Sequence, residues 1–171
     1  MEKKEVFIPK LNYFTLHARY LKNSQDSPYS SKISTARNLD KKDFIEIIKK
    51  ILEKFPTKKI VIITDSNGQK YFKKISKSFE SSLIFSKKIS KSFLGDMSLI
   101  LNSKRYFCYV GGGITATAIY SKIPYTVGWT TNVSNEVYWQ KNKYTVWQNK
   151  NQICANIKKV ENFFELIAQH T

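Results

Sequence analysis

Two kinds of hydrophobic pattern alternate along the chain. Short apolar runs rich in β-branched residues, such as residues 59–64 (KIVIIT), are typical of strands buried on both faces of a sheet. Other segments place apolar residues at helical spacing, most clearly residues 44–55, where lysines mostly take the remaining positions. Asp40 precedes this segment as a predicted N-cap, and Pro56 ends it.

The alternation continues to the end of the chain and predicts the fold class. Further strands are expected at residues 14–19, 81–86, 105–110 and 124–129, and helices at residues 69–79 and 94–103 and within 111–122. Strands that alternate with helices predict a Rossmann-like α/β fold, a parallel sheet with helices on both faces. We expect a single domain over residues 1–171, with a long loop at residues 22–36 and a closing helix at residues 153–169.

Composition limits the class of protein. A chain of 171 residues with 42% hydrophobic residues suffices for one packed domain and is short for two. No apolar run approaches the roughly 20 residues that span a bilayer, and the N-terminus does not resemble a secretory signal. Cys108 and Cys154 are widely spaced in apolar sequence, which favours buried free thiols in a reducing compartment. We therefore expect a cytoplasmic protein, with peripheral attachment to a membrane left open.

Charge suggests an anionic partner. The chain has 29 basic and 13 acidic residues, a net charge of +16, which suits nucleic acid, an acidic membrane surface or a phosphorylated ligand. Most of the cations are lysines spread along the chain, so a solvated basic surface explains them equally well. The segment KKISKSF occurs twice, at residues 73–79 and 87–93, and we assign it no function.

Polar residues follow the predicted strands where ligands bind in parallel sheets, at the carboxyl ends. His17 and Arg19 lie two residues apart on the first strand, so both side chains are expected on one face. A guanidinium beside an imidazole suits a phosphate, although an ordinary surface pair is the alternative. Asp65 and Ser66 follow the next strand, and Asp65 either holds a ligand hydroxyl or caps the helix after it.

Three consecutive glycines, Gly111, Gly112 and Gly113, follow the fourth strand. They allow the backbone to approach a ligand closely, and the next helix begins with amide groups suited to phosphate. The hydroxyl of Thr115 or Thr117 would add a donor. The pattern is neither a Walker A loop nor a G-x-G-x-x-G fingerprint, and a tight structural turn is the alternative.

Three further residues complete the candidate set. Arg37 and Asn38 precede the first helix and lead into the same edge of the predicted sheet. Glu136 is a candidate contact for a sugar hydroxyl, with an exposed loop glutamate as the alternative. Cys108 and Cys154 lack further residues of the kind that complete a metal site, and we expect no metal and no other cofactor.

Several of these segments together resemble a known family. Residues 14–19 (FTLHAR), an Arg-Asn pair before the first helix, residues 60–65 (IVIITD) and residues 109–127 (YVGGGITATAIYSKIPYTV) resemble the nucleotide-sugar-binding half of GT-B glycosyltransferases. The likeness is nearest to fucosyltransferase-like members, in which a strand ends in His-x-Arg. It implies a Rossmann-like fold and transfer of a sugar from a nucleotide diphosphate to a hydroxyl, in glycan or polysaccharide biosynthesis.

The resemblance assigns roles to the candidate residues. It implies that His17 and Arg19 bind the pyrophosphate of the donor, and that Asp65 with Ser66 contacts the nucleoside. It also implies that the glycine turn and Thr115 hold phosphate, partly through backbone amides. Arg19 and the helix end would then stabilise the charge that develops on the diphosphate leaving group.

The chain departs from the family in two respects. His17 is followed by Ala18, Arg19 and Tyr20, where better-known fucosyltransferases carry Arg-Gly-Asp or Arg-Thr-Asp after the histidine. Such enzymes also have two Rossmann-like domains, whereas this chain has the length of one. A partner chain or further domain would then supply the acceptor site and the base, or the protein is a relative without activity.

A nucleic-acid-binding protein is the second hypothesis. A net charge of +16 with ten Tyr, eleven Phe and three Trp would offer cations together with stacking surfaces. Most of these aromatic residues fall in predicted strands and apolar helix faces, where core packing explains them. Trp139 and Trp147, among amides and lysines, are the exception.

Overall fold

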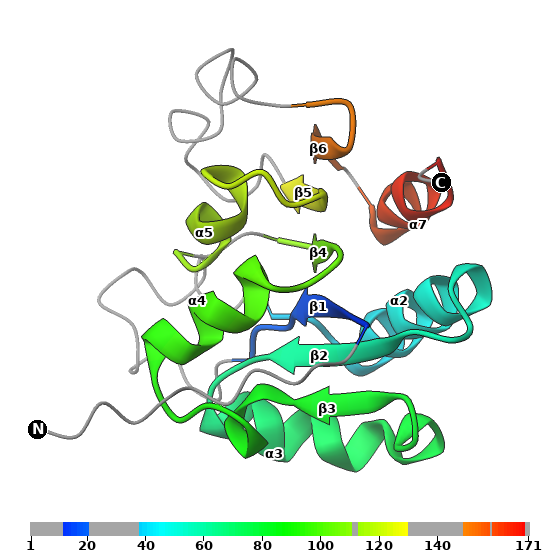
Figure 1. The fold of residues 1–171 in the computed structure, drawn as a ribbon. Coiled ribbons are helices and arrows are strands. Elements are labelled where there is room, and N and C mark those ends of the chain that lie inside the picture. Colours follow the sequence, from blue (N-terminus) through cyan, green and yellow to red (C-terminus); the bar gives the residue numbers. More distant parts are fainter. Residues whose placement is uncertain (1–11, 21–37, 111–112, 130–148, 158, 170–171) are drawn as a thin grey trace, which may run out of the picture.

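The computed structural model describes residues 12–20, 38–110, 113–129, 149–157 and 159–169. Within these residues six strands form one sheet, in which every pair of neighbours is parallel, in the order β3-β2-β1-β4-β5-β6 (Figure 1). The strands are β1 (Tyr13–His17), β2 (Lys59–Ile63), β3 (Leu83–Phe85), β4 (Tyr106–Cys108), β5 (Tyr125–Trp129) and β6 (Gln152–Asn156). This is the strand order of the Rossmann fold, so the predicted fold class is confirmed.

Helices cover both faces of the sheet. They are α2 (Lys41–Lys54), α3 (Ser66–Ile75), α4 (Phe93–Leu101), α5 (Thr115–Ile119) and α7 (Val160–Gln169), with 3-10 turns η2 (Lys77–Phe79) and η3 (Ser86–Lys88). Helices α2, α3 and α7 pack on one face against Leu16 and Ile62, and α4 and α5 pack on the other against Val61 and Val127. Alternate residues of each strand enter these two cores, because successive side chains of a strand point to opposite faces.

Aspartates set the beginning of two helices. The Asp40 carboxylate accepts a hydrogen bond from the Asp43 N–H at 2.8 Å, and the Asp65 carboxylate accepts one from the Gly68 N–H at 2.7 Å. Each bond satisfies a backbone donor that has no partner within its helix. The N-cap predicted at Asp40 is confirmed, and the capping role weighed for Asp65 is present.

The C-terminal segment corrects a prediction. A helix was expected over residues 153–169, but residues Gln152–Asn156 form β6, which pairs with β5, and the helix begins only at Val160. The buried Gln152 amide donates to the carbonyls of Ser121 and Ile123 at 2.8 and 2.9 Å, which anchors the beginning of the strand. The helical spacing of Ile157, Val160, Phe164 and Ile167 predicted the helix, but its extension back to residue 153 was wrong because residues 152–156 pair with β5. The predicted loop at residues 22–36 lies outside the described residues.

We predict that Gly128→Ala destabilises the sheet. A Cβ atom at Gly128 would lie 2.6 Å from the Tyr109 carbonyl oxygen and would also overlap the Ile157 side chain. Relief of this overlap requires backbone movement, so the free energy of unfolding in urea should fall by about 1–3 kcal/mol. Gly113→Ala is the control, because no atom lies within 4 Å of a Cβ built there. Equal stability of the two variants would contradict this packing.

Candidate functional site

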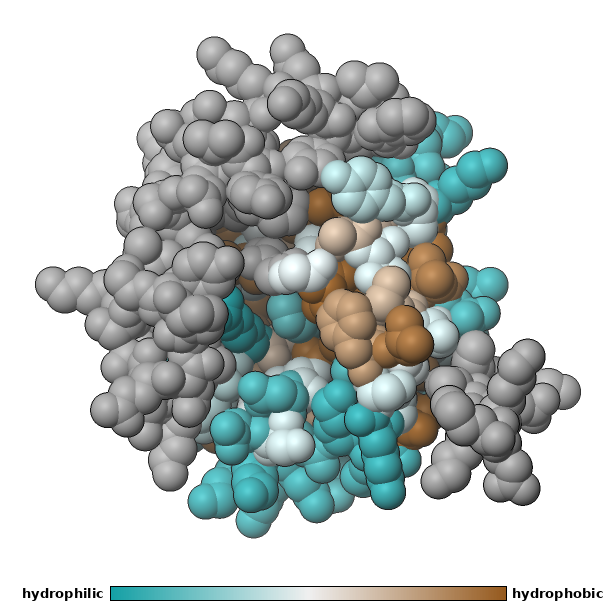
Figure 2. Space-filling model, turned by 90° about the vertical axis from the view of Figure 1, so that its left-hand side faces the viewer, coloured by the Kyte–Doolittle hydropathy of each residue, from teal (hydrophilic) through white to brown (hydrophobic). Residues whose placement is uncertain are grey.

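A pocket of about 420 Å³ opens at the carboxyl ends of β1 and β2, beside the segment that leads into α5. It is lined by residues from four parts of the chain: His17, Ala18, Arg19, Tyr20, Ile63, Thr64, Asp65, Lys87, Phe93, Asp96, Gly113 and Ile114. Figure 2 looks onto the side of the molecule where these strands end. Hydrophobic residues (brown) lie there next to a cluster of hydrophilic residues (teal). The pocket lies where the strand order reverses between β1 and β4, the usual ligand position in open α/β sheets.

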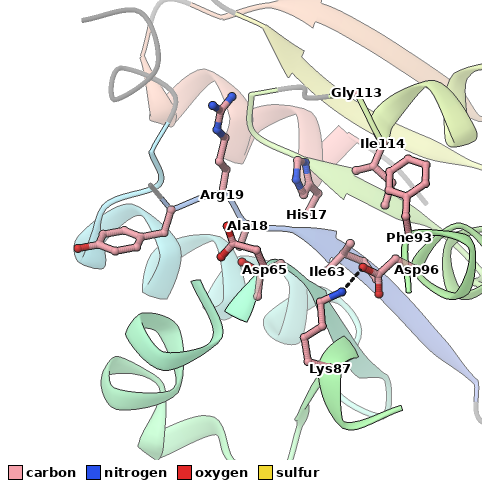
Figure 3. A pocket seen from close by; sticks show the side chains of 12 residues that line it. His17, Ala18, Arg19, Ile63, Asp65, Lys87, Phe93, Asp96, Gly113 and Ile114 are labelled. Atoms are coloured by element: carbon pink, nitrogen blue, oxygen red, sulfur yellow. Dashed lines mark hydrogen bonds and ion pairs between the residues drawn. The ribbon is translucent and has the colours of Figure 1, made fainter. Parts of the chain in front are cut away.

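His17 is the last residue of β1 and stands in the pocket as a neutral imidazole. In Figure 3 it lies between Arg19 on one side and Ile114 on the other. Its Nδ1 atom is 3.4 Å from the Cys108 Sγ atom on β4. Burial lowers the pKa of His17 from 6.5 to about 4, with the charge of Arg19 as the second cause. At pH 7 the ring is therefore uncharged and presents one N–H donor and one acceptor.

Arg19 also lines the pocket, although it lies beyond the end of β1. The Arg19 carbonyl accepts a hydrogen bond from the Leu39 N–H at 3.0 Å, which joins this segment to the residues before α2. His17 and Arg19 therefore reach one cavity, as predicted. Asn38 is partly buried next to Leu39 but does not line the pocket.

Asp65 lines the pocket, while its carboxylate already caps α3. Contact between Asp65 and a ligand stays a prediction. Ser66, the first residue of α3, is exposed and does not line the pocket, and the same is true of the partly buried Thr117 on α5. Four predicted site residues, Arg37, Gly111, Gly112 and Glu136, lie outside the described residues.

Thr115 does not take the predicted position. Its side chain is buried at 0% exposure, and its hydroxyl donates to the Cys108 Sγ atom at 3.6 Å instead of facing the pocket. The same hydroxyl lies 2.9 Å from the Tyr106 hydroxyl. Helix α5 has only five residues, so its dipole is small. Gly113 does line the pocket, with open space around it.

Sequence reasoning missed Lys87, Phe93 and Asp96. The Lys87 Nζ atom lies 2.6 Å from the Asp96 Oδ2 atom, and the two side chains are 22% and 8% exposed. The dashed line in Figure 3 marks this pair. The Asp96 Oδ1 atom is buried and has no hydrogen-bond partner in the described part of the chain. Lys87 and Phe93 are the first and last residues of the second KKISKSF segment. This segment directly follows the strand predicted at residues 81–86, and that position was the signal that could have placed it near the pocket.

The pocket combines polar groups with an apolar wall. Arg19, Lys87 and the neutral His17 supply hydrogen-bond donors, while Ile63, Ile114 and the 60% exposed Phe93 supply apolar surface. Such a site suits a ligand with an anionic part and a ring, because guanidinium binds phosphate and aromatic side chains stack on rings. Among the described residues no group of three or more His, Cys, Asp or Glu is placed to hold a metal ion. None of the described helices meets the length and hydropathy required to cross a membrane.

We predict a pKa near 4 for His17, measured by NMR titration of its ring. Because the unfolded chain binds this proton near pH 6.5 and the folded protein only near pH 4, acid favours unfolding. The stability of the wild type should therefore fall relative to His17→Gln between these pH values, by up to about 3 kcal/mol. A ring pKa of 6.5 or above would contradict a partly buried imidazole that is kept neutral by its surroundings.

We predict that Lys87→Ala destabilises the fold more than Lys88→Ala. The first change leaves the buried Asp96 carboxylate without its counter-ion, whereas Lys88 is exposed on the same turn. Loss of one member of a largely buried pair should lower the free energy of unfolding by about 1–3 kcal/mol. The exposed position should change it by less than about 0.5 kcal/mol. Equal effects in urea titrations would show that the ion pair adds nothing.

Comparisons with known proteins leave the function of this pocket to be argued from its own geometry. No protein-family model matches the chain, and no curated protein matches it. The resemblance to GT-B glycosyltransferases therefore stays an expectation from the short motifs, and the strand order shows the fold class alone. The arrangement of the pocket is the remaining basis for a functional proposal.

Proposed function

We propose that the pocket binds a nucleotide diphosphate sugar, and that the protein is a glycosyltransferase or the donor-binding half of one, in glycan or polysaccharide biosynthesis. The observation that carries the proposal is the presence of Arg19 and His17 in one cavity at the point where the strand order reverses. Dinucleotides and nucleotides bind at this point in Rossmann folds, and arginine binds phosphate with two parallel hydrogen bonds. The His-x-Arg motif at the end of β1 agrees with the resemblance.

The dimensions and lining of the pocket support such a ligand. A cavity of about 420 Å³ falls within the range of roughly 300–1,000 Å³ that small-molecule sites occupy. The diphosphate would lie by Arg19 and His17, and a ring of the ligand would pack on Phe93 or Ile114. The Asp96 Oδ1 atom would accept a hydrogen bond from a ligand N–H or hydroxyl, which would satisfy a buried acceptor.

The proposed reaction breaks the bond between the anomeric carbon of the sugar and the diphosphate oxygen. Negative charge develops on the diphosphate as this bond breaks, and the Arg19 guanidinium with the His17 N–H would stabilise it. The acceptor hydroxyl attacks the anomeric carbon and gives its proton to a base. One oxygen of each described carboxylate of the pocket is engaged, Asp65 Oδ1 with the Gly68 N–H at the beginning of α3 and Asp96 Oδ2 with Lys87. We therefore propose that a second chain or domain supplies the acceptor site and the base.

Burial of the aromatic residues counts against the alternative of nucleic-acid binding. Tyr13, Phe44, Phe72, Tyr106 and Tyr125 are fully buried and cannot stack on bases. A basic surface alone gives affinity that falls steeply with salt, whereas a specific nucleotide site depends less on salt. An inactive relative that binds nucleotide without turnover would share the pocket and differ only in lacking transfer.

We predict that one nucleoside diphosphate among GDP, UDP, CDP and ADP binds selectively in calorimetric titrations. Arg19→Ala should weaken this binding by about 10-fold to 100-fold, because a charge-assisted hydrogen bond contributes about 1.5–3 kcal/mol. Lys104→Ala is the matched control. Lys104 is exposed and precedes β4, so it lies where the strands begin, at the end of the sheet opposite the pocket.

Three results decide between the hypotheses. Binding that is lost in Arg19→Ala and retained in Lys104→Ala supports the donor site and identifies the nucleotide. Equal weakening in both variants, with steep salt dependence, indicates a general basic surface and favours nucleic acid. No binding of any diphosphate to the folded wild type refutes the proposed function.

A further inference from the structure

A chain of buried hydrogen bonds leads from the interior of the sheet to His17. The Tyr106 hydroxyl lies 2.9 Å from Thr115 Oγ1, Thr115 Oγ1 donates to Cys108 Sγ at 3.6 Å, and Cys108 Sγ lies 3.4 Å from His17 Nδ1. Tyr106, Cys108 and Thr115 all have 0% exposure. These groups lie beneath the pocket, and His17 is the member of the chain that lines it.

Donors converge on the Cys108 sulfur. The Thr115 hydroxyl donates to it, the Tyr106 side chain also hydrogen-bonds to it, and either oxygen of the Tyr106–Thr115 pair can be the donor. Burial raises the pKa of Cys108 from 9.0 to about 11, so its sulfur keeps a proton at pH 7. That sulfur also accepts a hydrogen bond from the Val110 backbone N–H. Because these donors occupy the lone pairs of the sulfur, the arrangement directs its S–H proton toward His17 Nδ1, 3.4 Å away.

We infer that Cys108, itself oriented by Thr115 and Tyr106, holds His17 in the tautomer with an unprotonated Nδ1 and a proton on Nε2. The Nε2–H is then the group that His17 offers to the pocket. Cys108 is thus a positioning residue, since it touches His17 and does not line the pocket. Without Cys108 the isolated imidazole would interconvert between its two neutral tautomers.

The inference gives a role to the buried Thr115 and to Cys108, which the proposed function leaves unused. A fixed Nε2–H would donate to an anionic oxygen without adding a positive charge, so Arg19 would supply the charge. This part rests on the proposed function. The tautomer itself is a property of the protein without ligand and can be tested separately.

The test is the protonation of the two ring nitrogens in ¹⁵N-histidine-labelled protein, read from long-range ¹H–¹⁵N correlation spectra at pH 7. The chain has two histidines, and His17→Gln identifies the signals of His17. In the wild type we expect an unprotonated Nδ1 and a protonated Nε2. Cys108→Ala should give a mixture of both tautomers, whereas Cys108→Ser, which retains a donor, should restore the wild-type pattern. Cys154→Ala, the other free thiol, should have no effect.

The outcomes separate this inference from the proposed function. A wild-type His17 with the proton on Nδ1, or a Cys108→Ala spectrum equal to the wild type, overturns the inference. Calorimetry with inorganic pyrophosphate gives the second readout: Cys108→Ala should bind about fivefold to tenfold more weakly than Cys108→Ser. If the tautomer is as expected and pyrophosphate does not bind even the wild type, the positioning role stands and the proposed function fails.

Discussion

The pairing of β1 on both of its edges determines the rest of the structure. β2 lies parallel to it on one side and β4 on the other, so the chain first extends the sheet through β2 and β3 and then returns to continue from β4. From β1 the sheet continues to β2 on one side, and from β4 it continues to β5 on the other, so the strand order reverses at this point, where open α/β sheets have their ligand crevice. β1 thereby carries His17 and Arg19 directly into that crevice, whereas an edge strand would have placed them at the margin of the sheet.

Alternation along β1 and β4 separates a neutral interior from a charged rim. The partly buried His17 points to the same face as the buried Cys108, Thr115 and Tyr106, and burial moves the pKa of each titratable group among them further toward its neutral form. Among the described pocket residues, the charged side chains are Arg19, the exposed Asp65 and the Lys87–Asp96 pair, whose carboxylate is largely buried. A ligand would therefore meet a fixed, uncharged hydrogen-bond donor together with a cation, an arrangement suited to orienting a phosphate group as well as attracting it.

The sequence predicts the elements that local patterns determine, and fails where contacts between distant residues decide. The β-branched run of β2 and the cap at Asp40 are local features and were predictable. β6 was not, because Gln152 reaches carbonyls about 30 residues away and pairing with β5 outweighs a helical spacing. Lys87 and Asp96 follow β3, which runs parallel to β1 and ends on the same side of the sheet. Their place in the pocket therefore depends on this strand pairing. The sequence also did not reveal that the hydroxyl of Thr115, the first residue of α5, lies against Cys108 and Tyr106 of β4.

The central claim is that a diphosphate occupies the crevice beside β1, and a chemical-shift map tests it most directly. Backbone amide signals would be followed while inorganic pyrophosphate is added to the labelled protein. The account predicts changes concentrated at residues 17–20, 63–65 and 113–115, on the edge where β1 and β2 end. Changes spread over the exposed lysines of α2 and α3, with residues 17–20 unaffected, would contradict it and leave the pocket without its proposed ligand.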